Sequence, residues 1–128
     1  MPVYHLSKNA SPEIVDSVNA FLQSEHPAFV LFYMDGCGPC AATRPEWMRL
    51  EDDFADDDMM GIIDIEMSKM QDLHNKKLQE NVAGFPTLRY IRDGHCEDYE
   101  ACDGITKDRS YRSFVEWIKK KEGKKTRG

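Results

Sequence analysis

The sequence predicts a single α/β domain in which a central mixed β-sheet is flanked by helices, in three layers (α/β/α). Residues 28–34, AFVLFYM, form a nearly continuous apolar run, which is typical of a strand buried on both faces of a sheet. Strand-like and helix-like segments alternate along the chain, as they do in layered α/β folds. Asp93 and Gly94 form a type I′ turn signal between two strand-like runs, so we expect a hairpin and then a last helix.

The limits of the elements follow from periodicity and capping residues. Ser11 and Pro12 are typical of a helix N-cap and first position, and apolar residues at helical spacing continue to about Gln23. Pro45 should kink the helix after the central strand because it removes a backbone donor. The expected strands cover residues 3–6, 28–34, 61–66, 88–92 and 95–101, and the expected helices cover residues 12–23, 37–54, 70–81 and 108–120.

The length and charge pattern indicate one domain followed by a basic tail. The chain has 128 residues, enough for one domain with a single core, which we assign to residues 1–120. Residues 119–128, KKKEGKKTRG, carry six Lys or Arg against one Glu, so we expect residues 121–128 to be a disordered tail. A nucleic-acid or anionic-surface partner is the less favoured interpretation of this tail.

The composition also predicts a compartment. No apolar run approaches the roughly 20 residues of a membrane span, and the N-terminal residues contain no apolar segment of signal-peptide length. We therefore expect a cytoplasmic protein with no membrane partner. In a reducing compartment the four cysteines are more often catalytic, metal-binding or incidental than a structural disulfide framework.

A close cysteine pair, Cys37-Gly38-Pro39-Cys40, directly follows the apolar strand. A strand that delivers such a pair into a helix places one thiol at the helix N-terminus, where unpaired amides and the helix dipole stabilise a thiolate. Cys37 is therefore the expected nucleophile. Two intervening residues leave both sulfurs within disulfide reach, so Cys40 is the expected resolving thiol. The redox-active disulfide Cys37–Cys40 would serve as the redox group, and we expect no other cofactor and no metal.

These features together resemble the thioredoxin family, from about Val3 to Lys120. The resemblance rests on the CGPC motif after an apolar strand, Pro45 five residues past the second cysteine, the segment Phe85-Pro86-Thr87, and Gly94 at the hairpin turn. It implies the thioredoxin fold and a thiol-disulfide oxidoreductase that reduces protein disulfides. It also implies two partners, protein disulfide substrates and an electron-donating reductase.

The resemblance further implies a substrate-binding segment, since Phe85, Pro86 and Thr87 match the family's cis-proline segment. A cis bond at Pro86 would present the backbone of Phe85 beside Cys37, where an extended substrate could pair with it. The active-site loop implied by the resemblance contains Gly36, Gly38 and Pro39.

A second resemblance complicates the direction of the reaction. Residues 86–94, PTLRYIRDG, and the segment Tyr99-Glu100-Ala101 are similar to protein disulfide isomerase domains, which usually have His where this chain has Pro39. A His between the thiols helps to stabilise the thiolate and so disfavours the disulfide. We therefore favour a reductase and keep an isomerase or oxidant as an alternative.

Three positions depart from the family pattern. The usual buried acidic residue six positions before the first cysteine is Leu31, and its usual Lys partner falls at Ile62 on an ungapped reading. Because Leu31 cannot titrate, we expect proton transfer to Cys40 through water or a carboxylate elsewhere, and slower resolution of the mixed disulfide. Gly36, preceded by Asp35, replaces the usual Trp and predicts a different partner set. A thioredoxin-fold binding or scaffold module with weak redox activity therefore remains a second hypothesis.

The other two cysteines, Cys96 and Cys102, lie six residues apart on the expected return strand. On a regular strand they would share a face and lie ~20 Å apart, too far for a mutual disulfide. We interpret them as free structural or incidental thiols, with a regulatory or intermolecular role as the alternative. A zinc site is disfavoured by Pro39 and by the strand-to-helix setting; it would combine cysteines with one of His5, His26, His74 or His95.

Overall fold

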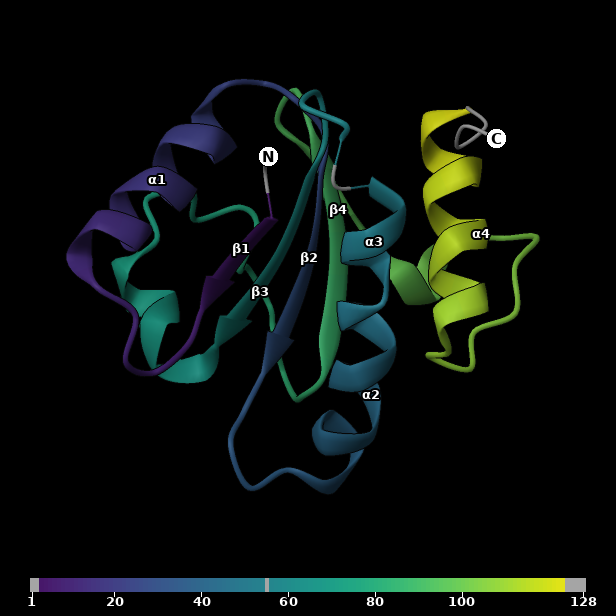
Figure 1. Cartoon of the computed structure of the whole chain (residues 1–128), viewed down its shortest axis with the longest axis horizontal. Helices are drawn as coiled ribbons and strands as arrows, with labels where there is room; N and C mark the ends of the chain where they lie inside the picture. The colour runs from purple at the N-terminus through teal and green to yellow at the C-terminus, as the bar shows by residue number, and fades with distance from the viewer. Residues whose placement is uncertain (1–2, 55, 124–128) are drawn as a thin grey trace.

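The computed structural model describes residues 3–54 and 56–123 and shows a five-stranded mixed sheet with helices on both faces (Figure 1). The strands are β1 (Val3–Leu6), β2 (Ala28–Tyr33), β3 (Gly61–Glu66), β4 (Thr87–Arg92) and β5 (His95–Asp98). The helices are α1 (Pro12–Gln23), α2 (Gly38–Met48), α3 (Leu50–Phe54) and α4 (Tyr111–Glu122), with short 3-10 helices η1 (Met67–Asp72) and η2 (Tyr99–Ala101). This is the three-layer α/β/α arrangement that the sequence predicts.

The central position of β2 organises the sheet, whose strand order is β1-β3-β2-β4-β5. β2 pairs in parallel with β3 and antiparallel with β4, while β1 lies parallel to β3 and β5 antiparallel to β4. All six residues of β2 are buried, because helices cover both faces of the sheet there. The prediction of a central strand buried on both sides is confirmed.

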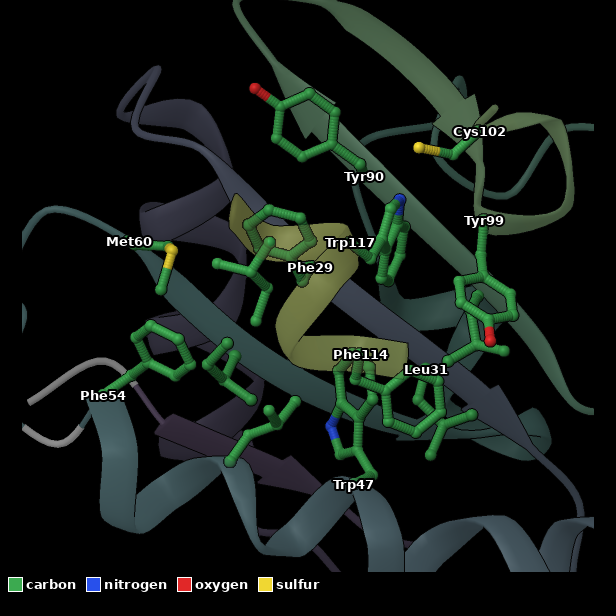
Figure 2. Packing of buried hydrophobic residues seen from close by; sticks show 14 residues of the cluster. Phe29, Leu31, Trp47, Phe54, Met60, Tyr90, Tyr99, Cys102, Phe114 and Trp117 are labelled. Atoms are coloured by element: carbon green, nitrogen blue, oxygen red, sulfur yellow. The ribbon is translucent and has the colours of Figure 1, made fainter. Parts of the chain in front are cut away.

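Two hydrophobic clusters divide the side chains of β2 by alternation. Phe29 and Leu31 face α2, α3 and α4, where the aromatic rings of Trp47, Phe114 and Trp117 pack (Figure 2). The Phe29 and Trp117 rings meet edge to face with centroids 5.0 Å apart, a favourable aromatic geometry. The opposite face packs under α1 and contains Val30 and Phe32, with Val18, Phe21, Ile63 and Leu78.

The helix caps agree with the local sequence at α1 and move the start of α4. The Ser11 hydroxyl accepts the Ile14 N–H at 3.3 Å, so α1 begins where predicted. Ser110 and Ser113 cap α4 reciprocally, and α4 therefore starts at Tyr111 rather than at residue 108. It continues to Glu122, past the predicted domain limit at residue 120. Residues 124–128 of the predicted tail lie outside the described residues.

The helix predicted over residues 37–54 is divided into two in the structure. α2 continues through Pro45, and the interruption lies at Arg49. Leu50 and Phe54 of α3 are buried in the same cluster as Trp47 of α2, so both segments are held against the sheet. Tertiary packing therefore places the break, which no local sequence signal at Arg49 predicts.

The helix predicted over residues 70–81 is wrong. Only η1 forms there, because side chains from other elements bind the backbone that a helix would use. The Asn19 side chain donates to the Asp72 carbonyl at 3.1 Å and accepts the His74 N–H at 2.8 Å. The Arg89 guanidinium donates to the carbonyl oxygens of Leu78 and Glu80. The apolar spacing reflects burial of leucines rather than helical periodicity.

The return strand of the hairpin is shorter than predicted. Asp93 and Gly94 both have positive φ, 51° and 82°, as a type I′ turn requires. However, β5 ends at Asp98 and η2 turns the chain, so the expected shared face of the two outer cysteines is wrong. Cys96 packs against the cluster under α1, whereas Cys102 is buried in the cluster under α2, α3 and α4. Both are free thiols.

Candidate active site

The strand-to-helix junction places the cysteine pair at the start of α2. Cys37 is the N-cap residue, and its sulfur accepts the Cys40 N–H at 3.2 Å. Gly36, with φ 82°, lets the loop turn into the helix, because side-chain-bearing residues rarely adopt this backbone conformation. Gly38 and Pro39 form the first turn of α2. The Cys40 amide at the start of the helix therefore points toward the Cys37 sulfur.

The two sulfurs lie in different surroundings. Cys37 is partly exposed, whereas Cys40 is 1% exposed. Burial, reinforced by the hydrogen bond with Cys37, raises the pKa of Cys40 to about 11, although a hydrogen bond with the Met34 backbone and the positive charge of Arg109 act in the opposite direction. Cys37 is thus the thiol that a substrate can reach, and Cys40 stays protonated behind it.

The predicted substrate-binding segment lies beside the exposed thiol. The Phe85–Pro86 peptide bond is cis, as predicted, and the Cys37 sulfur lies 3.7 Å from the Phe85 carbonyl oxygen. The Thr87 hydroxyl donates to the Gly84 carbonyl at 2.6 Å and braces the segment. An adjoining cavity of about 530 Å³ is lined by residues that include Phe85, Pro86, Thr87, Glu100 and Arg109. The structure therefore brings the cysteine pair and the cis-proline segment together.

The positions that depart from the family pattern are apolar and buried, as their sequence indicates. Leu31 is 0% exposed and Ile62 is also buried. In the register of β2 and β3, however, Leu31 lies opposite Asp64, while Ile62 lies opposite Phe29. Asp64 is only 3% exposed. A buried carboxylate therefore lies one strand from Leu31, and sequence reasoning missed it.

Asp64 belongs to a polar group that we call the His5 cluster, formed by His5, Glu51 and Asp64. The Nδ1 atom of His5 lies 2.6 Å from the Asp64 carboxylate, and its Nε2 atom lies 3.0 Å from Glu51. The hydrogen bond to Asp64 is the main cause that raises the pKa of His5 above its ordinary value, against the effect of burial. A lone Asp within the apolar run of β3 was the available signal for this cluster.

A second buried carboxylate, Glu66, ties the end of β3 to the loop before the cysteines. It accepts the Ser68 N–H at 2.9 Å and also the Ser68 hydroxyl. Burial opposes its ionisation, but the hydrogen bonds from Ser68 and from the Asp35 backbone prevail and hold the pKa of Glu66 below its ordinary value. Asp35 also lies 3.6 Å from Lys8. The active-site loop is thus anchored to the sheet by an ionised group.

The described part of the chain contains neither a metal-binding cluster nor a membrane-spanning helix. Among residues 3–54 and 56–123, no group of three or more His, Cys, Asp or Glu side chains is arranged to hold a metal ion. The separation of Cys96 from Cys102 by the sheet agrees with that finding. Within the same residues, every helix is too short or too polar to cross a membrane.

Residues 11–120 match the thioredoxin family model. This chain belongs to the thioredoxin family. Among curated proteins it is 28% identical over 123 residues to protein disulfide-isomerase A5 of Bos taurus, covering 94% of this chain and 20% of that protein. It is 30% identical over 105 residues to human protein disulfide-isomerase A2, covering 77% of this chain and 18% of that protein. The chain thus spans about a fifth of these relatives' length.

Solved structures show the same fold. The J-Trx1 fragment of ERdj5 superposes with a TM-score of 0.67 at 22% identity, covering 95% of this chain and 52% of that chain. The oxidised thioredoxin of Plasmodium falciparum superposes with a TM-score of 0.59 at 14% identity, covering 93% of this chain and 97% of that chain. The predicted thioredoxin fold is confirmed, and the cysteine pair occurs in a domain of the family that uses CxxC active sites.

Proposed function

We propose that this chain is a thiol-disulfide oxidoreductase that reduces disulfides in protein substrates. The observation that carries the proposal is the asymmetry of the dithiol, in which Cys37 caps α2 beside the Phe85 carbonyl and Cys40 is buried behind it. An exposed sulfur at a helix N-terminus is suited to attack, and a buried neighbour within reach is suited to resolve.

The reaction proceeds in two exchanges. The Cys37 thiolate attacks one substrate sulfur, the substrate S–S bond breaks, and the second substrate sulfur leaves as a thiolate. Cys40 then loses its proton and attacks the Cys37 sulfur, which breaks the mixed disulfide and releases the first substrate sulfur. The substrate gains two electrons and the protein retains the Cys37–Cys40 disulfide. An electron-donating reductase must return the pair to the dithiol form.

Pro39 supports a reductase because it places no cationic imidazole between the sulfurs, whereas a charged neighbour would favour the dithiol form and make the pair more oxidising. A reducing role also fits the cytoplasm, which we propose as the compartment. The curated relatives are named protein disulfide-isomerases, and these names favour an isomerase or oxidant as the second candidate. A reduction potential of about −270 mV would support the reductase, and a potential of about −180 mV would support the second candidate.

The substrate is proposed to be a protein segment in extended conformation. Its backbone would pair with that of Phe85 while its disulfide lies over Cys37, a form of strand addition. Asp35 and Gly36 at the edge of the site offer a charge and an open backbone in place of a flat aromatic surface. The partner set is therefore proposed to differ from that of family members with Trp at this position.

The experiment that tests the proposal is insulin reduction with dithiothreitol as the electron source. Wild type should accelerate the reaction, and Cys37→Ser should remove the acceleration. Cys96→Ser is the matched control, because it removes another partly exposed thiol that lies away from the dithiol. A wild type no faster than Cys37→Ser would refute the enzyme and favour the binding or scaffold module instead.

A further inference from the structure

A hydroxyl group lies on the buried face of α2, behind the dithiol. Three residues of α2 are buried, and their spacing places them on one face of the helix: Cys40, Thr43 and Trp47. Thr43 is only 3% exposed, and it lies between a thiol and an aromatic ring on this face. A polar side chain in such a place is stable only if it is hydrogen-bonded. The partner of the Thr43 hydroxyl therefore indicates what the group does.

The hydroxyl binds the backbone of the cysteine motif. It donates to the Pro39 carbonyl at 2.8 Å. The peptide group that joins Pro39 to Cys40 carries the Cys40 N–H at its other end, and this N–H donates to the Cys37 sulfur at 3.2 Å. A single chain of hydrogen bonds thus leads from the Thr43 hydroxyl, through one peptide group, to the sulfur of Cys37.

Hydrogen bonds in such a chain strengthen one another. A peptide group that accepts a hydrogen bond at its carbonyl becomes a stronger donor at its N–H, because both bonds polarise the group in the same direction. The effect is larger in a medium of low dielectric constant, and Thr43 and Cys40 are both buried. The charged form of the Cys37 sulfur gains most from the stronger donor, since hydrogen bonds to ionised groups exceed those to neutral groups. The chain therefore favours the thiolate.

Pro45 increases the importance of the Thr43 hydroxyl. It lacks the N–H that would donate to the Ala41 carbonyl, so the middle of α2 is short of one helical hydrogen bond. The Pro39 carbonyl meets the Thr43 amide by ordinary helix geometry, and the hydroxyl is a second donor to the same oxygen. The hydroxyl thus supports the turn that carries both cysteines. Its removal would still leave the carbonyl with a partner.

We infer that Thr43 is a positioning residue of the dithiol, whose hydroxyl acts through the Pro39–Cys40 peptide group to stabilise the Cys37 thiolate. The inference rests on the proposed redox function, because the thiolate is the form that attacks a substrate disulfide. Thr43 acts on the nucleophile through the backbone and takes no part in the transfer of electrons. Without its hydroxyl, the thiolate should form at higher pH.

The other groups around the Cys37 sulfur are untouched by a substitution at Thr43. The Phe85 carbonyl lies 3.7 Å from the sulfur on the cis-proline segment, and the second thiol faces it from α2. Asp35, on the loop before the helix, carries a charge that is partly offset by Lys8 at 3.6 Å. Because these groups are common to all variants, a difference between the variants reports on the hydrogen-bond chain.

The test measures alkylation of Cys37 by iodoacetamide in the full chain, from pH 5 to pH 9. The thiolate attacks the reagent's carbon, a C–S bond forms and iodide leaves, so the rate follows the fraction of Cys37 in the thiolate form. Peptide mapping by mass spectrometry distinguishes Cys37 from the other cysteines. The position of the rate profile along the pH axis reports the stability of the thiolate, whereas the alkaline plateau reports access and intrinsic reactivity.

Thr43→Val keeps the shape of the side chain, suits a buried position and lacks the hydroxyl. It should lower the rate about twofold on the acidic side of the profile and leave the plateau unchanged. The factor follows because a strengthening of about 10–30% in a hydrogen bond to a charged sulfur corresponds to roughly twofold in the thiolate equilibrium. Thr43→Ser is the matched control. It keeps the hydroxyl and loses only a methyl group, so its profile should coincide with that of wild type.

The inference is overturned if Thr43→Val gives the wild-type profile, or if Thr43→Ser is displaced as far as Thr43→Val. A lower plateau with an undisplaced profile in Thr43→Val also overturns it, since that result indicates a packing role. Should Thr43→Val fail to fold, as judged by circular dichroism, an undisplaced profile in Thr43→Ala still overturns it. Iodoacetamide is not a disulfide. A failure in insulin reduction therefore refutes the proposed function separately, without deciding the role of Thr43.

Discussion

The dithiol site and the His5 cluster lie on the same side of the sheet but contain different chemical groups. At the dithiol, Cys40 is buried and Leu31 packs among aromatic side chains. One strand away, the buried carboxylate of Asp64 is bonded to His5. A buried carboxylate is stable only where polar partners satisfy it, and the His5 cluster supplies one. This chain therefore has a buried acid in its sheet, but the acid is bonded to His5 and lies one strand from Leu31.

The separation has a chemical consequence for resolution of the mixed disulfide. Asp64 stands in direct register with Leu31, so the acid occupies the neighbouring strand rather than position 31 itself. Cys40, with a pKa of about 11, must therefore lose its proton without a carboxylate at Leu31. We therefore expect Cys40 to resolve the mixed disulfide more slowly than in family members with an acidic residue at the position of Leu31.

The largest expected effect concerns the two thiols themselves. Iodoacetamide at pH 8 should modify Cys37 and leave Cys40 almost untouched, because a thiol with a pKa of about 11 is ionised in roughly one molecule in a thousand at that pH. Peptide mapping by mass spectrometry measures the modification of each cysteine. Comparable labelling of both would mean that Cys40 is more accessible or more acidic than its burial implies.

The second-largest effect is expected from placing an acidic residue at position 31. Leu31→Asp should accelerate turnover near neutral pH by supplying an acid–base group, while lowering the free energy of unfolding by about 3–5 kcal/mol through a second buried charge beside Asp64. Insulin reduction and urea denaturation measure the two quantities.

Leu31→Asn is the control for that variant, because it is polar and similar in size to Asp but cannot titrate. It should lose stability without any gain in rate. Equal rates for Leu31→Asp and wild type would show that the missing acid does not limit turnover.

A smaller effect is expected at Glu66. Its pKa is lowered in the folded protein, so its contribution to stability is complete above the ordinary value of about 4.5 and is lost as pH falls through the lower folded value. Glu66→Gln should cost about 1–2 kcal/mol at pH 7 and flatten the acid side of the stability profile. Urea denaturation from pH 3 to pH 8 checks this, and the exposed Glu13→Gln should leave the profile unchanged.

The smallest effect tests the His5 cluster. The pKa of His5 is raised, so its stabilising contribution is complete below the ordinary value of 6.5 and is lost as pH rises through the higher folded value. The His5 side chain is 41% exposed, so we expect less than about 1 kcal/mol. His5→Gln should remove this pH dependence from urea denaturation curves.

The same His5→Gln variant also tests whether the dithiol site is independent of the His5 cluster. If they are independent, the pH profile of insulin reduction should match that of wild type. A displaced profile would show that His5 and Asp64 supply protons to the dithiol after all.

Local sequence signals predicted the elements whose formation depends on neighbouring residues. Ser11 caps α1, Asp93 and Gly94 form the hairpin turn, and the apolar run around Leu31 is the central strand. The sequence also predicted correctly that the cysteine pair lies at the strand-to-helix junction, because the pair directly follows the apolar run of β2. These features are encoded within a few residues of sequence.

Tertiary structure decided what depends on segments far apart in the chain. The helical spacing of Leu73 and Leu78 was misleading, because burial under α1 satisfies both leucines while Asn19 and Arg89 bind the surrounding backbone. Asp64 comes to lie beside Leu31 only through the register of β2 and β3. Only the folded chain brings Arg109 into the cavity that Phe85 and Pro86 line.

By itself, then, the sequence determined the dithiol, the proline that follows it in the helix and the order of the layers. Short-range sterics and hydrophobic alternation are enough to specify these features. The tertiary structure decided which distant groups meet: Asp64 opposite Leu31, His5 bonded to Asp64, and the Phe85 carbonyl beside the Cys37 sulfur. The reason is physical, since the pKa of a buried group depends on neighbours that meet only when distant segments pack together.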